Sequence, residues 1–181
     1  MPTTNLLTRP VTVAACVAAL LLTACGGGRK SDTTAPATLA EQIQQLEASG
    51  KLPKLDRSDD IRGLDTDNNG IRDDIDAWIA ALPITDVQKR AAQQMARVQQ
   101  AKLVANLTDK TSLQLLGDRS MAGVSCLVDV FKPNNQMGYD LIDQIEANTA
   151  NTKNRAMQYL AYNRAVSGSS GTLPSGNTCE P

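Results

Sequence analysis

Within the twelve residues 65–76, oxygen-bearing side chains stand at the spacing of a cation site. Calcium takes about six to eight oxygen ligands at ~2.3–2.6 Å on a tightly curled backbone. Side chains at alternate positions of such a loop point inward, and at positions 1, 3 and 5 these belong to Asp65, Asp67 and Asn69. The other candidate ligands are the backbone carbonyl at position 7 and the carboxylates at positions 9 and 12, which belong to Ile71, Asp73 and Asp76. The spacing therefore predicts a site for one Ca²⁺ ion.

The turn and the acidity of this loop bear on whether an ion is needed. Gly70 stands at position 6, where a sharp turn needs a residue that tolerates positive φ. The carboxylates at the ligand positions would repel one another without a cation, although Arg72 offsets part of that repulsion. The alternative is a connector rich in Asx turns, whose carboxylates cap the helix that contains Ile75.

The twelve residues resemble the calcium loop of EF-hands and the related loops of extracellular thrombospondin type 3 and dockerin modules. The resemblance includes every ligand position, but Asp76 replaces the longer glutamate at position 12, which implies weaker binding. Arg72 stands at position 8, where paired EF-hands carry an aliphatic residue, and residues 59–63 do not have the pattern of an entering helix. The resemblance therefore implies a lone loop without a partner hand.

Several other chemistries are excluded by composition. The chain has no histidine, so it can build no Ser-His-Asp triad, Cys-His dyad or imidazole zinc site. Its five aromatic residues are too few for stacking platforms, and a net charge of −1 leaves no electrostatic footprint for nucleic acid. Asp59 and Asp60 are adjacent, whereas a glycosidase needs two carboxylates on opposite sides of a sugar-binding cleft.

The N-terminal end of the chain has an export pattern. An apolar run of twelve residues, 11–22, follows Arg9 and leads into Leu22-Thr23-Ala24-Cys25. Twelve residues of helix span about 18 Å, short of the ~30 Å hydrocarbon layer, so the run fits the apolar part of a signal peptide. This order resembles a bacterial lipoprotein signal, whose cysteine is acylated before cleavage; an ordinary secretory signal ending in a cysteine is the alternative.

The lipoprotein resemblance implies a domain organisation and a location. Residues 1–24 would be removed, Cys25 would carry the lipid, and residues 25–37 would form a flexible tether. Gly26 follows the cysteine in place of the aspartate that is associated with retention in the inner membrane. We therefore expect a lipid anchor in the outer membrane and a domain that faces the periplasm.

Two cysteines remain for the folded domain if Cys16 leaves with the signal and Cys25 carries lipid. These are Cys126 and Cys179, and an exported chain without a Cys-x-x-Cys motif predicts one disulfide between them. Two buried free thiols are the alternative. A bridge across 53 residues would contribute about 4 kcal/mol in the chain-entropy model.

Helical patterns cover most of the mature chain. Capping-box pairs begin two helices, Thr38 with Glu41 and Thr85 with Gln88, and the first helix closes at Gly50. Gly117 and Gly123 count against a continuous helix around them, since each costs about 1 kcal/mol relative to alanine. The expected helices cover approximately residues 39–49, 75–82, 86–106, 109–131, 139–147 and 152–166. The sequence therefore predicts an all-α bundle of five to six helices over residues 38–168, with a Ser/Gly/Pro tail at 169–181.

These features together predict a lipid-anchored envelope protein with a structural or binding role, stiffened by one calcium ion and one disulfide. We expect no catalytic activity and no nucleic-acid partner, while another envelope protein is a possible partner. No feature of the sequence identifies a small-molecule substrate. A metal-dependent hydrolytic enzyme of the envelope, using the acidic loop as its site, is the alternative.

Overall fold

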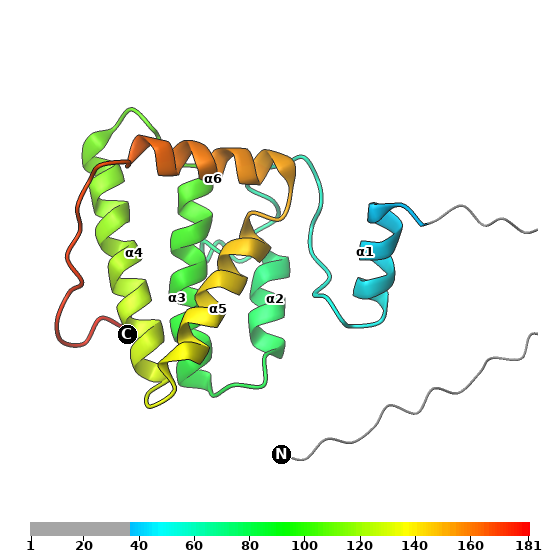
Figure 1. Ribbon diagram of the computed structural model, residues 1–181, viewed down its shortest axis with the longest axis horizontal. Coiled ribbons are helices and arrows are strands. Elements are labelled where there is room, and N and C mark those ends of the chain that lie inside the picture. Colours follow the sequence, from blue (N-terminus) through cyan, green and yellow to red (C-terminus); the bar gives the residue numbers. More distant parts are fainter. Residues whose placement is uncertain (1–36) are drawn as a thin grey trace, which may run out of the picture. The chain divides into compact units, whose positions relative to one another are not determined.

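The computed structural model describes residues 37–181, and the expected signal peptide and Cys25 lie outside the described residues. Residues 37–181 form six α-helices and no strand, which confirms the all-α prediction (Figure 1). The helices are α1 (Leu39–Ala48), α2 (Asp73–Ala81), α3 (Asp86–Leu103), α4 (Lys110–Val130), α5 (Asn135–Thr149) and α6 (Lys153–Ala165). None of these six helices has the length and apolarity required to cross a membrane.

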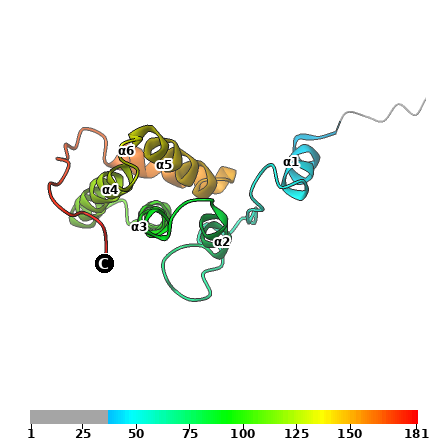
Figure 2. The ribbon, with the colours of Figure 1, turned by 90° about the horizontal axis from the view of Figure 1, so that it is seen from below.

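Helix α3 lies at the centre of the bundle, and α2, α4, α5 and α6 all pack against it. Figure 2 shows α2, α3 and α4 in one layer, with α5 and α6 on one side of that layer. Alanines on α3 and a glycine on α4 let these two helices approach closely. A Cβ at Gly123 would lie 3.2 Å from the Met95 sulfur, so the Met95 side chain would have to shift to accept a larger residue. Helix α4 runs through Gly117 and Gly123, as the predicted helix 109–131 does, and close packing against α3 accounts for a glycine at position 123.

The core is built from aliphatic residues of α2, α3, α4 and α5. Its large aliphatic and methionine side chains that are at most 1% exposed are Ile71, Ile75, Ile79, Met95, Leu127 and Ile145. Full burial of one such side chain contributes roughly 1.5–3 kcal/mol. Because Ile71, Ile75 and Ile79 belong to this core, the end of the acidic loop and helix α2 are fixed to the rest of the bundle.

The helix boundaries follow the capping signals more closely than the apolar spacing. Thr38 and Thr85 both form the predicted capping boxes, with Glu41 and Gln88 respectively. Helix α5 covers Asn135–Thr149 and is longer at both ends than the predicted 139–147. Its extra turns consist mainly of polar residues, which have no apolar periodicity to mark them. Helix α1 buries none of its residues, and Arg57 pairs with its Glu47 at 2.7 Å.

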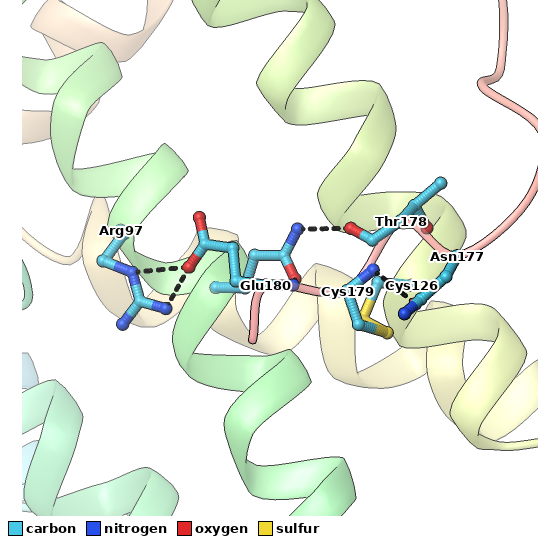
Figure 3. Close-up of a disulfide and its surroundings, with 7 residues drawn as sticks. Arg97, Cys126, Asn177, Thr178, Cys179 and Glu180 are labelled. Atoms are coloured by element: carbon cyan, nitrogen blue, oxygen red, sulfur yellow. Dashed lines mark hydrogen bonds and ion pairs between the residues drawn. A yellow bond between two sulfur atoms is a disulfide. The ribbon is translucent and has the colours of Figure 1, made fainter.

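The C-terminal tail returns to the bundle and is bridged to α4 (Figure 1). Cys126 and Cys179 form a disulfide with their Cα atoms 4.9 Å apart, which confirms the predicted pairing. The side chain of Gln94 on α3 donates to the Thr178 carbonyl and accepts from the Glu180 N–H, both at 3.0 Å. Figure 3 shows these contacts beside the disulfide, together with the ion pair of Arg97 and Glu180. The end of the tail is therefore held by polar contacts as well as by a covalent bond.

Candidate metal centre

Three carboxylates of the acidic loop lie close together. One oxygen each of Asp65, Asp67 and Asp73 falls within 4.8 Å of the other two. Asp65 and Asp67 precede helix α2, whereas Asp73 is the first residue of that helix. Three converging carboxylates are a donor set suited to hard cations, so this cluster could hold a metal ion.

The loop curls around the Asp65 carboxylate. Its two oxygens accept hydrogen bonds from the backbone N–H groups of Asn69, at 3.1 Å, and Gly70, at 3.0 Å. Asn68 and Gly70 adopt positive φ angles of 56° and 83°, as this tight curl requires. A β-branched residue in place of Gly70 would strain the backbone. It would thereby move the Asp65 carboxylate away from the carboxylates of Asp67 and Asp73.

Asp73 connects the two ends of the loop. Its carboxylate accepts from the Thr66 hydroxyl at 2.6 Å and from the Thr66 N–H at 2.8 Å. These two hydrogen bonds lower the pKa of Asp73 against a smaller opposing effect of desolvation. The carboxylate is therefore held in its charged form, at the helix terminus where negative charge is favoured.

The structure places the other predicted ligands around this cluster. The Asn69 side-chain NH₂ donates to Asp67 and to Asp76, both at 3.0 Å, while its Oδ1 accepts from the Ile71 N–H at 2.8 Å. Asp76 also accepts from Gln93 on α3 at 2.8 Å. Asp76 is thus linked to the three-carboxylate cluster through Asn69 and does not belong to it.

The connector alternative predicted both Asx turns and helix capping by the acidic side chains. The Asx-type contacts are present, since Asp67 also accepts from the Asn69 N–H at 3.2 Å. No acidic side chain caps α2 at its N-cap, which is Arg72, but Asp73, Asp74 and Asp76 lie in its first turn, where negative charge is favoured. The features of a connector are therefore present together with the convergence of Asp65, Asp67 and Asp73.

Arg72 anchors the loop to the bundle. Its side chain is 1% exposed and pairs with Asp74 at 2.5 Å. Its guanidinium also donates to the carbonyls of Asn148 and Thr149, at 3.3 and 3.2 Å, at the end of α5. Gly63 leaves room for this side chain, since a Cβ there would lie 2.2 Å from the Arg72 Cδ. Arg72, at position 8 of the loop, therefore joins the loop to α5.

A second buried arginine holds the segment that precedes the loop. Arg155 on α6 is fully buried and pairs with the Asp56 carboxylate at 2.7 Å. It also donates to the carbonyls of Asp56 and Asp60, each at 2.6 Å. Desolvation acts to raise the pKa of Asp56, but hydrogen bonds from Ser58 and Arg155 and the charge of Arg155 lower it to about 2. The Asp56 N–H donates to Asp74 at 2.7 Å, so the two arginine networks are continuous.

A cavity of about 430 Å³ adjoins the loop. Asp73 lies on its wall, together with Asp56, Asp74 and Arg72. The carboxylates of Asp56 and Asp74 face the guanidinium groups of Arg155 and Arg72, and Asp73 is bound by Thr66. The acidic groups on this wall therefore already have donors within the protein.

The comparisons with models of protein families, with curated proteins and with solved structures found no match for this chain.

Proposed function

We propose that this protein is a lipid-anchored envelope protein whose helical domain has a structural or binding role and is stiffened by one calcium ion. The observation that carries the calcium assignment is the convergence of Asp65, Asp67 and Asp73 within 4.8 Å. An oxygen-only donor set favours calcium over the softer transition metals. The Asn69 amide oxygen, the Ile71 carbonyl and Asp76 complete the set expected from the loop spacing.

A structural role for the ion is supported by what the loop connects. Ile71 and Ile75, on either side of Asp73, are both 1% exposed in the core, and Arg72 between them is bonded to the end of α5. An ion that neutralises the three carboxylates would therefore stabilise the junction between the loop, α2 and α5. Such an ion acts on the fold and requires no open coordination position.

Calcium is expected to raise the melting temperature and to change the fluorescence of Trp78, the only tryptophan, which lies on α2 two residues after Asp76. The expected affinity is on the order of 10⁻⁴–10⁻³ M, typical of extracellular sites. At about 10 mM calcium this affinity corresponds to about 1.4–2.7 kcal/mol of added stability by mass action. Fluorescence titration and thermal unfolding measure both effects.

Matched variants assign the response to the loop. Asp67→Ala removes one converging carboxylate and is expected to abolish the response, whereas Asp86→Ala, an exposed acid at the start of α3, retains it. Magnesium at the same concentration is expected to have a smaller effect, because it demands octahedral geometry and dehydrates reluctantly. If calcium changes neither signal in the wild type, the acidic loop is only a connector.

Lipidation is expected at Cys25, on the basis of Leu22-Thr23-Ala24-Cys25. The wild-type protein should incorporate labelled palmitate and partition into the detergent phase from outer-membrane fractions. Cys25→Ser should incorporate no palmitate, while Cys16→Ser, earlier in the signal, should be processed normally. A wild-type protein that is released entirely into the soluble fraction and begins at another residue would refute the anchor.

A second candidate function, metal-dependent hydrolysis, is favoured by the 430 Å³ cavity that Asp73 borders. It would require the ion to keep one coordination position open toward that cavity. Replacing Asp60, an exposed acid on the cavity wall, by asparagine alters the cavity and leaves every expected ligand of the ion in place. Under the structural role this variant retains the full calcium response in melting temperature and fluorescence.

A further inference from the structure

A buried lysine at the end of α3 has no anion bound to its ammonium group. Lys102 is 8% exposed, and its Nζ forms no hydrogen bond or ion pair with another residue of the described segment 37–181. The rings of Tyr159 and Tyr162 lie 6.0 and 5.7 Å from the Nζ, at the outer limit of cation–π contact. Burial lowers the pKa of Lys102, and the charge of Glu146 opposes that shift.

The side chain of Tyr162 provides a second free donor beside this lysine. Tyr162 is 4% exposed, its hydroxyl is bonded to no other residue within 37–181, and that oxygen is not one of the fully enclosed polar atoms. Burial raises the pKa of Tyr162, so the hydroxyl keeps its proton at neutral pH. Tyr159 differs, because desolvation and a hydrogen bond with Glu146 raise its pKa to about 12.

Lys102 and Tyr162 line the same cavity. This second cavity measures about 610 Å³ and lies between α4, the end of α6 and residues 169–171 of the tail. Its apolar walls include Leu113, Met121 and Val166, while exposed Lys110 and Asp118 lie on its rim. The charged side chains that line it are two lysines and one aspartate, so the cavity carries a net charge of +1. Its volume is in the range of sites for small organic ligands.

We propose that this cavity binds a small amphiphilic monocarboxylate, with the carboxylate at Lys102 and Tyr162 and the apolar body against Leu113, Met121 and Val166. Neither the Lys102 Nζ nor the Tyr162 hydroxyl is among the fully enclosed polar atoms that lack a partner, so a ligand in the cavity can reach both groups. A carboxylate can accept from both groups at once, and it neutralises the buried charge. The site is distinct from the acidic loop, and the inference does not depend on the proposed calcium ion.

The chemistry of the cavity favours a carboxylate over a phosphate. Phosphate sites usually present an arginine fork or a helix N-terminus, whereas this cavity offers one buried ammonium and one phenol. The charges of Lys110 and Asp118 on the rim offset each other, so the cavity's net charge of +1 matches the single negative charge of a carboxylate. The apolar side chains on the walls match a ligand with a hydrocarbon or aryl body.

A binding role for Lys102 and a packing role have opposite consequences for stability. If Lys102 serves binding, Lys102→Met removes a charge that burial disfavours and keeps the side-chain length, so the melting temperature should rise or stay unchanged. If the lysine serves the fold through the tyrosine rings and the negative end of α3, the same variant should melt at a lower temperature.

The test uses the full chain in lipid nanodiscs, with 4-phenylbutyrate and its neutral amide as probes and empty nanodiscs as the blank. Binding is measured by saturation-transfer NMR. The carboxylate should bind at least about tenfold more tightly than the amide, as expected for a hydrogen bond between charged groups. Lys102→Met should remove this difference, and Tyr162→Phe should weaken carboxylate binding a few-fold.

Two matched controls complete the test. The first control is Tyr159→Phe, on the same helix as Tyr162, which removes a hydroxyl that interacts with Glu146. The second control is Lys132→Met, which removes a lysine from an exposed turn. Both variants should bind the carboxylate like the wild type. Should Lys102→Met fail to fold, the comparison of Tyr162→Phe with Tyr159→Phe still decides the question. Equal binding of acid and amide, no binding at 10 mM, unchanged affinity in Lys102→Met, or displacement by equimolar inorganic phosphate would each overturn the proposal.

Discussion

Replacing Arg155 by methionine is expected to lower the free energy of unfolding by about 3–5 kcal/mol, the range for breaking a buried ion pair from one side. Methionine fills much of the same volume but removes the hydrogen bonds that Arg155 donates to the Asp56 carboxylate and to the carbonyls of Asp56 and Asp60. For a chain of this size the loss corresponds to a melting temperature lower by roughly 6–20 °C.

Chemical denaturation followed by circular dichroism measures this loss, with Arg164→Met as the control. Arg164 lies on the same helix and is exposed, so its replacement should change stability by less than about 0.5 kcal/mol. Hydrogen exchange should show the largest loss of protection in residues 56–62, which Arg155 holds. Arg155 and Arg164 variants of equal stability would show that the buried network contributes nothing.

Removal of the disulfide is expected to have an effect of similar size. The double variant Cys126→Ala/Cys179→Ala should lose about 4 kcal/mol, because the bridge closes a loop of 53 residues in the unfolded chain. The melting temperature should fall by roughly 8–16 °C. Alanine avoids placing a polar hydroxyl at Cys126, which is fully buried in the core.

Thiol counting provides the independent measurement. Under denaturing conditions the mature protein should show no free thiol before reduction and two after it, if Cys25 carries the proposed lipid. The Gln94→Ala variant serves as a comparison, since it loses the polar contacts of the tail but keeps the covalent bridge. Two alkylatable thiols in freshly isolated protein would contradict the pairing.

The sequence predicts the parts of the fold that depend on interactions between residues close together in the chain. The boxes at Thr38 and Thr85 depend on residues three positions apart, so their helices begin where expected. The disulfide was predicted from the small number of cysteines and from the expectation that the chain is exported. The length of helix α5 was underestimated because the residues at its ends are mainly polar. These residues are helical because of the packed bundle around them, and no apolar periodicity in the sequence marks them.

The buried charges could not be located from the sequence, because their partners are distant along the chain. Arg155 bonds to residues up to 99 positions away, and Arg72 bonds to carbonyls 76 and 77 positions away. Charged side chains are rarely fully buried unless paired, so periodicity alone places them on the surface. One signal was present: residues 56–76 carry a net charge of −5, so balancing cations had to come partly from elsewhere.

The bridge between Cys126 and Cys179 also makes the C-terminal third of the chain a covalent macrocycle that includes α5, α6 and most of the exposed tail. Residues 167–177 are exposed, and such segments are where proteases cut first. A single cut there leaves both fragments joined through sulfur, one carrying Cys126 and the other Cys179. A nicked molecule would therefore keep its mass on a non-reducing gel and separate into two pieces only after reduction.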